Sequence, residues 1–477
     1  MTPDEFRRAG HALVDWIAAY RERLAVGELP VQATVRPGEL LAQLPAAAPE
    51  HGEPFEAFLR DLDNLILPGI THWQHPRFFG YFPSGASLAS VLGDMLSTGL
   101  GVVGLNWQAS PALTELEQVT TDWLRDLLGV PSTFSGVIQD TASTASFIAL
   151  VSARERATDY GAAREGLQGG GAPLVVYASS QAHSSIEKAA LLAGFGRDYV
   201  RAIPVDTEFR MQVPALAAAI GRDRAAGLRP CAVVATTGTT ATTAMDPIAP
   251  IAAIARHDGL WLHVDAAMGG TAMLLPECRH YWSGIEGADS IVVNPHKWMT
   301  VAFDCSLYLV RDPEHLVRVM STNPSYLQTP MDAQVRNYRD WGIALGRRFR
   351  ALKIWLTLRE QGAQAIRERL RRDLANARWL AAQVDGAPSW RRLAPVTLQT
   401  VCVRHEPLGL EGEALDRHTR RWVQAINDSG SAYLTPAMID GHWMARVSIG
   451  IESTEPAHVE ALWQTMRAAA EVSAGVA

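Results

Sequence analysis

The chain has 477 residues, of which 48% are hydrophobic and 19% are charged. This length and composition predict a large buried core and two or three domains. The 43 basic and 50 acidic residues give a net charge of −7, and without a basic stripe we expect no binding to nucleic acid. The four cysteines have no CxxC spacing, which indicates reduced thiols and no metal site. We expect a cytoplasmic protein that does not bind membranes, because an apolar signal core and runs of membrane-spanning length are lacking.

The first predicted element is a helix at the N-terminus. Thr2 and Glu5 have the spacing of a capping box, and Pro3 stands at the first helical position. The apolar side chains that recur on one face of this helix are Phe6, Leu13, Ile17, Tyr20 and Leu24. Residues 30–54 form a connector rich in Pro, Ala and Glu, so we expect this face to be covered by another subunit or by the rest of the same chain.

Residues 86–352 alternate between apolar strands and amphipathic helices, which predicts an open, mostly parallel α/β sheet. One helix is well marked, since it begins at Ser110–Pro111 and ends at Gly129. The residues predicted to line its buried face are Leu113, Leu116, Trp123 and Leu127. Strands are predicted at Leu174–Tyr177, Cys231–Ala235, Trp261–Val264 and Ile291–Val293. Polar residues follow these strands, and ligands bind at the carboxyl ends of strands in such sheets.

Two of these strand ends carry residues that suit one cofactor. Lys297 follows the strand at Ile291–Val293, and partial burial there would lower its pKa enough for it to act as a nucleophile. Asp265 follows the strand at Trp261–Val264. A carboxylate that keeps a pyridine nitrogen protonated and a lysine that forms a Schiff base are the two halves of a pyridoxal phosphate site. Taken singly, Lys297 would be a surface residue and Asp265 a helix N-cap, but the pairing favours the cofactor site.

Two further groups are predicted at the same edge. Residues Asp140–Ser146 place small hydroxyl side chains and free backbone N–H groups at a predicted helix N-terminus, which suits a phosphate group, although helix capping explains the same residues. His183 follows the strand at Leu174–Tyr177, where its ring either lies flat on a planar cofactor or packs inside the protein. No GxGxxG motif follows a predicted strand, and the motifs GxxxxGK[ST] and GxSxG are not present in the sequence, so dinucleotide-binding, P-loop and serine-hydrolase functions lose their main support.

Four segments resemble the signatures of one family: Ser180–Glu187, Trp261–Ala267, Asn294–Trp298 and Leu345–Arg350. They are similar to the group II pyridoxal phosphate decarboxylases of the aromatic-L-amino-acid decarboxylase type, and the similarity runs from about residue 4 to about 470. The resemblance implies pyridoxal phosphate fold type I (aspartate aminotransferase-like), an α/β fold with helices on both faces of a mostly parallel sheet. The helix and strand pattern predicts a large α/β domain at 86–352, which would bind the cofactor, and a small C-terminal α+β domain at 353–477. The resemblance implies that residues 1–85 are an N-terminal helical dimerisation segment.

The resemblance also implies roles for particular residues. The implied catalytic residues are Lys297, His183, Tyr326 and Asp265. The implied pyridoxal phosphate-binding residues are Ala142, Ser143, His183, Thr236, Asp265, Ala267, Asn294, His296 and Lys297. The implied substrate-binding residues are Trp73, Tyr81, Phe82, Pro83, Ser84, Leu105 and Gly346. No metal is implied.

The segment Ser321–Gln334 has neither helical nor strand periodicity, which predicts a long mobile loop of the kind that closes over active sites. In the family a tyrosine of this loop returns a proton to the substrate carbon, and Tyr326 occupies its position. Members with phenylalanine there tend to form aldehydes, so Tyr326 and His183 favour simple decarboxylation.

Substrate choice is predicted to depend on two segments, Thr71–Ser84 and Gly104–Trp107, whose aromatic residues suit a flat ring or, alternatively, ordinary core packing. Leu105 stands where animal enzymes of the family have phenylalanine. Gly346 stands where plant relatives carry glycine or serine according to whether indole or phenol substrates are favoured, and glycine leaves more room for the ring, which favours tryptophan. Arg339 and Arg347 are expected to hold the structure around the loop and the active site, and not the substrate carboxylate. If one of them clamped that carboxylate, transamination would be favoured over decarboxylation.

The sequence therefore predicts a homodimeric enzyme, with active sites at the subunit interface, that converts an aromatic L-amino acid (tryptophan, tyrosine, phenylalanine or DOPA) to its amine and CO₂. Three alternatives remain open at this stage. The first is an aldehyde synthase or an aminotransferase, and the second is a decarboxylase of histidine, glutamate or diaminobutyrate. The third is a binding protein without catalysis, in which all the groups at the sheet edge have ordinary structural roles.

Overall fold

The computed structural model describes residues 1–168 and 170–475. Contacts divide the chain into two compact units. The smaller unit consists of Met1–Pro83, Asn376–Leu393 and Val401–Ala477, and the larger unit of Ser84–Ala375 and Ala394–Thr400. The expected division into the domains 1–85, 86–352 and 353–477 stays a prediction.

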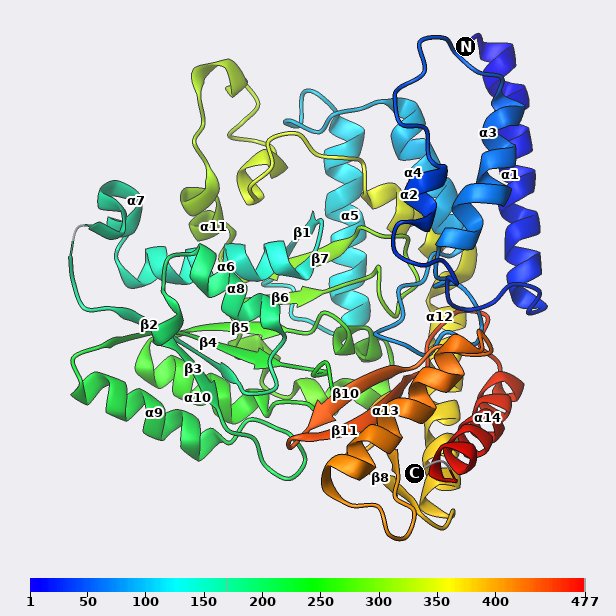
Figure 1. Cartoon of the computed structure of the whole chain (residues 1–477). Helices are drawn as coiled ribbons and strands as arrows, with labels where there is room; N and C mark the ends of the chain where they lie inside the picture. Colours follow the sequence, from blue (N-terminus) through cyan, green and yellow to red (C-terminus); the bar gives the residue numbers. More distant parts are fainter. Residues whose placement is uncertain (169, 476–477) are drawn as a thin grey trace. The chain divides into compact units, whose positions relative to one another are not determined.

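The larger unit is built on a seven-stranded sheet (Figure 1). Its strands, in spatial order, are β1 (Ser135–Gln139), β7 (Ser306–Val310), β6 (Ser290–Val293), β5 (Trp261–Asp265), β4 (Arg229–Thr236), β2 (Leu174–Ser179) and β3 (Val200–Ile203). The pairs from β3 through β2, β4 and β5 to β6 are parallel, while β7 runs antiparallel to both β6 and β1. The prediction of a mostly parallel sheet is confirmed, and the reversed strand β7 gives the sheet a mixed character that was not foreseen.

Helices cover both faces of this sheet. Those of the larger unit are α4 (Leu88–Leu100), α5 (Pro111–Leu128), α6 (Ala142–Ala157), α7 (Gly161–Glu165), α8 (Ser184–Leu192), α9 (Val213–Ala225), α10 (Ile248–Asp258) and α11 (Pro313–Met320). Figure 1 shows α6 and α8 on one side of the strands and α9 and α10 on the other. Apolar residues of α6, α8, β2 and β4 form one continuous core, in which Leu150 and Val176 are fully buried.

Helix α5 has the predicted limits, but its buried face differs from the prediction. The Ser110 hydroxyl accepts the Leu113 N–H, and Gly129 ends the helix with a φ of 76°, a conformation that favours glycine. Trp123 was predicted to be buried but is 40% exposed. The buried residues are Leu113, Thr114, Glu117, Thr120, Thr121, Leu124 and Leu128. The prediction was wrong because it followed only apolar side chains, whereas the true face includes polar residues that find partners inside the protein.

The smaller unit combines helices with a four-stranded sheet. Its helices are α1 (Pro3–Ala25), α2 (Glu39–Gln43), α3 (Phe55–Asp61), α13 (Gly412–Asp428) and α14 (Pro456–Ala474), and its strands, in spatial order, are β10 (Thr435–Ile439), β11 (His442–Ser448), β9 (Thr400–His405) and β8 (Trp390–Arg392). Helix α12 (Ala351–Asp385) belongs partly to each unit and is interrupted at Gly362, where φ is 73°. Among the described residues, no helix combines the length and hydropathy needed to cross a bilayer.

Helix α1 begins with the predicted capping box of Thr2 and Glu5. Its apolar face is covered only in part within the smaller unit. Leu24 is 1% exposed, and the Tyr20 hydroxyl lies 2.9 Å from Nδ1 of His72. Phe6, at the other end of the helix, is 59% exposed. The first half of the helix therefore presents an apolar surface to solvent in this chain.

Candidate active site

Three of the predicted catalytic residues lie at the carboxyl edge of the large sheet. His183 follows β2, Asp265 is the last residue of β5, and Lys297 lies four residues beyond the end of β6. His183 caps helix α8, and its Nδ1 lies 2.8 Å from the Ser185 hydroxyl. Desolvation and the Lys297 ammonium lower the pKa of His183, and the Asp265 carboxylate partly opposes them. Lys297 and Asp265 therefore both lie within electrostatic reach of His183, as expected for residues at one sheet edge.

Asp265 is held at this edge by the sheet itself. Its carbonyl accepts the Thr237 N–H at 2.9 Å, and its carboxylate accepts the Ala267 N–H at 3.1 Å. The residue is only 5% exposed. A buried carboxylate needs a positive or hydrogen-bonding partner, and a pyridinium N–H supplies both. In the parallel pair of β4 and β5, Thr236 lies directly opposite Asp265.

Lys297 lies between two buried aromatic side chains that fix its position. His296 is 4% exposed, and its Nδ1 accepts the Cys305 N–H at 3.0 Å. Trp298 is fully buried, and its Nε1 donates to Asp373 at 2.8 Å. The turn before it is closed by the Lys297 N–H, which donates to the Asn294 carbonyl at 3.0 Å. The backbone of Lys297 is therefore rigidly placed, while its side chain is only half-buried.

The sequence contains three lysines, which makes the comparison among them decisive. Lys188 is exposed on helix α8. Lys353 is fully buried, and its Nζ donates to the Ala302 and Asp304 carbonyls and pairs with Asp94 at 3.3 Å. Lys297 is the lysine that follows the carboxyl end of β6, the parallel neighbour of the strand that ends in Asp265.

The predicted phosphate seat is the N-terminus of helix α6. Thr141 caps this helix, and its hydroxyl accepts the Thr144 N–H. Ala142 is buried and Ser143 is exposed in the first turn. The N–H groups of a first turn have no intrahelical acceptor, and the helix dipole adds positive potential there. This helix end follows β1 and therefore offers donors to a phosphate group.

One orphaned atom tests whether these residues fit pyridoxal phosphate. The Thr236 hydroxyl is buried and has no hydrogen-bond partner in the part of the chain that the structure describes. Burying such a group without a partner is unfavourable. Thr236 lies opposite Asp265 in the sheet, and a polar group of the bound cofactor would satisfy its hydroxyl. The lysine, the carboxylate and the helix N-terminus would suit the aldehyde, the ring nitrogen and the phosphate of the cofactor.

The remaining predicted cofactor residues surround Lys297 and Asp265. The Asn294 side chain accepts the Ser306 hydroxyl at 2.7 Å, and the Asn294 N–H donates to the Ala267 carbonyl at 2.9 Å. These contacts join the turn after β6 to the turn after β5. Burial lowers the pKa of His296 to about 4, so its ring is neutral near pH 7. Asn294, His296 and Ala267 thus hold the two turns that present Lys297 and Asp265.

The predicted substrate residues fall in both units. In the larger unit, the Ser84 hydroxyl donates to the His296 carbonyl at 3.0 Å, Leu105 is half-buried, and a Cβ added at Gly346 would lie 3.4 Å from Val103. In the smaller unit, Trp73 stacks on Tyr81 with ring centroids 5.4 Å apart. The residues that complete this aromatic cluster are Phe78, Phe82, Tyr433 and the guanidinium of Arg446. Pro83 is buried.

Tyr326 lies on the predicted loop, within the short 3₁₀ turn Ser325–Leu327. Its side chain is 76% exposed. Arg339, which is 5% exposed, donates to the Leu327 carbonyl at 2.8 Å and pairs with Asp340 at 3.4 Å. The loop is therefore attached at the base, while the tyrosine hydroxyl faces solvent in this conformation.

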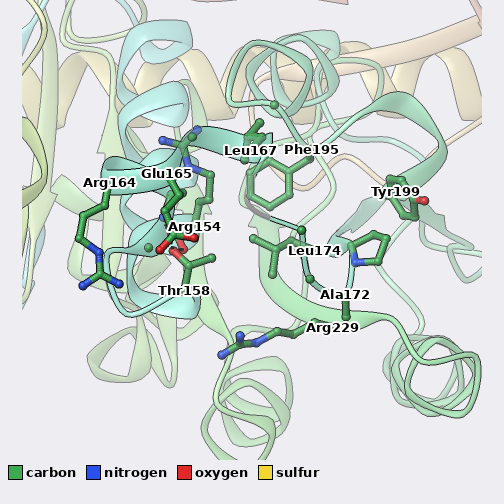
Figure 2. Close-up of a pocket in the computed structure, with 17 residues that line it drawn as sticks. Arg154, Thr158, Arg164, Glu165, Leu167, Ala172, Leu174, Phe195, Tyr199 and Arg229 are labelled. Atoms are coloured by element: carbon green, nitrogen blue, oxygen red, sulfur yellow. Dashed lines mark hydrogen bonds between the residues drawn. The ribbon is translucent and has the colours of Figure 1, made fainter.

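A cavity of about 490 Å³ lies elsewhere in the larger unit. Its wall includes Leu174 and Arg229, which are the first residues of β2 and β4 (Figure 2). These parallel strands begin there and end at the edge that carries Asp265, so the cavity is at the opposite edge of the sheet. Among the described residues, no group of three or more His, Cys, Asp and Glu side chains could hold a metal ion.

Sequence reasoning missed one buried charged pair near these residues. Glu117 of α5 pairs with Arg347 at 2.6 Å, and both side chains are almost fully buried. The spacing of Leu113, Glu117, Leu124 and Leu128 was the available signal, because a carboxylate in the middle of a buried helix face requires an internal partner.

The fold and the groups at its carboxyl edge define a pyridoxal phosphate-dependent enzyme. Residues 37–406 match the family model described as "Pyridoxal-dependent decarboxylase conserved domain". The chain is 38% identical to a tyrosine decarboxylase of Papaver somniferum, over 98% of this chain and 94% of that protein. It is also 38% identical to a phenylacetaldehyde synthase of Arabidopsis thaliana, over 98% and 96%. A crystal structure of Oryza sativa TDC with PLP and tryptamine superposes with a TM-score of 0.94 and 34% identity, covering 99% of this chain and 98% of that one.

The chain therefore belongs to the pyridoxal-dependent decarboxylase family. The predictions of fold type I, of pyridoxal phosphate as cofactor and of a carboxy-lyase are confirmed. The alternative of a binding protein without catalysis is thereby set aside.

Proposed function

We propose that this enzyme decarboxylates an aromatic L-amino acid to the corresponding amine and CO₂. The observation that carries the proposal is the convergence of Lys297, Asp265 and His183 at one sheet edge in a member of the decarboxylase family. Relatives named as a tyrosine decarboxylase and a TDC solved with tryptamine support an aromatic substrate.

Each residue at the sheet edge has a separate role in the proposed reaction. When bound, the cofactor accepts the electron pair that remains on the substrate Cα after CO₂ departs. Asp265 keeps a proton on the pyridine nitrogen, which maintains that electron demand. His183 is neutral near pH 7 because its pKa is lowered, and its exposed ring is available to contact a planar ligand. Lys297 would hold the cofactor through its aldehyde carbon, and its amine would be placed to accept or return protons during the reaction.

Two arginines near the site are unavailable to the substrate carboxylate. Arg347 donates to Glu117 and to the Ile138 carbonyl, both at 2.6 Å, while Arg339 is held by the Leu327 carbonyl and Asp340. A carboxylate clamped by arginine would be retained, and transamination would follow. Because both arginines are paired inside the protein, loss of the substrate carboxylate as CO₂ is favoured. Tyr326 is the residue that returns a proton to Cα.

A second product class has its own support. The phenylacetaldehyde synthase relative is as similar to this chain as the tyrosine decarboxylase is. An aldehyde synthase would consume O₂ and water and release the aldehyde, CO₂, ammonia and hydrogen peroxide. A panel of tryptophan, tyrosine, phenylalanine, DOPA, histidine and glutamate, scored for CO₂, amine and peroxide, separates these outcomes. Amine and CO₂ in equal amounts from an aromatic substrate support the proposal, and peroxide in equal amount to CO₂ contradicts it.

The proposed role of Lys297 can be tested directly, because the sequence has three lysines and a label on one of them identifies the residue that binds the cofactor. We predict that borohydride reduction of the cofactor-loaded enzyme labels the peptide that contains Lys297, and that Lys297→Ala abolishes the label. Lys188→Ala is the matched control, since this exposed residue lies on helix α8 and should leave labelling unchanged. A label on Lys188 or Lys353 would refute the assignment.

The homodimer and the cytoplasmic location are part of this proposal. Helix α4 exposes a row of apolar residues that a second copy of the chain would cover: Leu88, Leu92, Met95, Leu96 and Leu100, each about half exposed. Such a patch is unusual on a monomer surface. The four cysteines are buried and form no disulfide bond among the described residues, which suits a reducing compartment. Light scattering at several protein concentrations would test the dimer, and a monomer throughout would exclude it.

A further inference from the structure

Glu117 and Arg347 form a buried ion pair that also holds backbone. Glu117 is 1% exposed, and its Oε1 accepts Nη2 of Arg347 at 2.6 Å and the Ile138 N–H at 2.8 Å. The same Nη2 donates to the Ile138 carbonyl at 2.6 Å. The pair is therefore hydrogen-bonded to both the backbone N–H and the backbone carbonyl of Ile138 in β1. Two residues further on, the chain reaches Asp140 and then the cap of helix α6, the proposed phosphate seat.

The pair also fixes the two positions at which substrate selectivity is predicted. The Arg347 carbonyl accepts the Gly104 N–H at 2.9 Å, and Gly104 directly precedes Leu105. Gly346 directly precedes Arg347 in the chain. A Cβ at Gly104 would lie 2.8 Å from the Leu113 side chain, so this segment is packed closely against α5. Movement of Arg347 would therefore displace Leu105 and Gly346 together.

A third connection runs to the base of the loop that carries Tyr326. The Arg347 guanidinium lies 5.0 Å from the ring centroid of Tyr338, which is 3% exposed and begins the short helix after the loop. The Trp107 N–H donates to the Asn337 side chain at 2.9 Å. The loop base and the Gly104–Trp107 segment are thus joined to each other and to Arg347.

The pair is poorly arranged for stability alone. Oε2 of Glu117 and Nη1 of Arg347 are buried and have no hydrogen-bond partner within the described parts of the chain. Charged atoms left unsatisfied add a desolvation penalty, and buried ion pairs are often weaker stabilisers than apolar residues of the same size. What the pair does supply is geometry, because Glu117 holds both Ile138 and Arg347, and Arg347 in turn contacts Gly104 and the ring of Tyr338.

We propose that Glu117 is a positioning residue for substrate selectivity. It holds Arg347, and Arg347 places Leu105, Gly346 and the base of the Tyr326 loop around the substrate side chain. This inference rests on the proposed function, since it concerns the aromatic side chain of the amino acid to be decarboxylated.

The test compares two isosteric substitutions of buried, arginine-paired glutamates. Glu117→Gln removes the charge that holds Arg347. Glu155→Gln is the matched control, because Glu155 is 2% exposed, pairs with Arg154 at 2.7 Å and accepts the Ala163 N–H at 3.0 Å. Arg154 belongs to the cavity at the opposite sheet edge (Figure 2). We expect Glu117→Gln to change the ratio of kcat/KM for tryptophan and tyrosine by about threefold or more, and Glu155→Gln to leave this ratio unchanged.

A second measurement does not depend on catalysis. Hydrogen exchange followed by mass spectrometry should show faster exchange in Glu117→Gln for peptides that span 101–112 and 321–337, with other peptides near wild-type values. Glu155→Gln should accelerate exchange only around 158–165. A uniform increase over the whole chain in Glu117→Gln would indicate general destabilisation and would overturn the proposal.

The outcomes separate this inference from the proposed function. If the wild-type enzyme produces no amine from any aromatic amino acid, the proposed function fails. If it does, and Glu117→Gln keeps the wild-type selectivity ratio, the positioning role fails while the function stands. If Glu117→Gln does not fold, Glu117→Asp keeps the charge and shortens the side chain, and we expect a smaller shift of the same ratio. A folded Glu117→Asp enzyme with wild-type selectivity would then leave Glu117 as a stability residue only.

Discussion

The unpaired hydroxyl of Thr236 leads to a prediction in which stability and cofactor affinity change in opposite directions. Thr236 is 3% exposed, and its Oγ1 finds no hydrogen-bond partner among the described residues. In the enzyme without cofactor, an unsatisfied buried hydroxyl costs roughly 1–3 kcal/mol. Thr236→Val keeps the shape of the side chain and removes the hydroxyl. We therefore expect the cofactor-free variant to be more stable than the wild type by about 1 kcal/mol.

The same substitution should weaken cofactor binding. If the hydroxyl bonds to a polar group of pyridoxal phosphate, its loss removes one hydrogen bond with a net value of about 0.5–1.5 kcal/mol. At about 1.4 kcal/mol for each factor of ten, the Kd should rise by about 2- to 12-fold. Urea unfolding of the cofactor-free protein measures the first effect, and equilibrium dialysis against pyridoxal phosphate measures the second.

Thr419→Val provides the matched control. Thr419 is fully buried in helix α13 of the smaller unit, and its hydroxyl likewise has no partner among the described residues. Its substitution should stabilise the protein without altering the Kd. Wild-type affinity in Thr236→Val, together with raised stability, would show that Thr236 does not contact the cofactor. An equal loss of affinity in both variants would show that the loss is indirect.

Most of the cofactor edge could be predicted from the sequence because its signals are local. Each of Lys297, Asp265 and His183 follows an apolar strand, and parallel strands bring their carboxyl ends together whatever the order of the strands. The strand order and the reversed strand β7 could not be derived in this way. They depend on which strands pair, and Ser306–Val310 reads like any other buried strand.

The positions of the residues expected to contact the substrate side chain were harder to predict from the sequence, for a physical reason. The selectivity positions Leu105 and Gly346 lie in segments without periodicity, and their placement depends on Arg347. The partner of Arg347 is a carboxylate 230 residues away in sequence. A search for apolar stripes passes over Glu117, because a paired charge on a buried face looks like a surface residue until its partner is known. The same bias placed Trp123 in the core, although it is 40% exposed.

Two further predictions concern the loop and the buried histidines. Tyr326→Phe should lower amine formation and raise peroxide and aldehyde from the same substrate, as measured by coupled assays; unchanged amine output would remove Tyr326 from its assigned role. His263 is fully buried and His296 nearly so, and burial lowers the pKa of each to about 4. These two histidines take up a proton near pH 6.5 in the unfolded chain but only near pH 4 in the folded chain. Their contribution to stability is therefore constant above pH 6.5 and falls as the pH drops toward 4. At pH 5 each histidine should lower the free energy of unfolding by about 2 kcal/mol relative to pH 7. His263→Gln should remove one of these two contributions in urea titrations at both pH values, and an unaltered pH dependence in this variant would contradict the assignment.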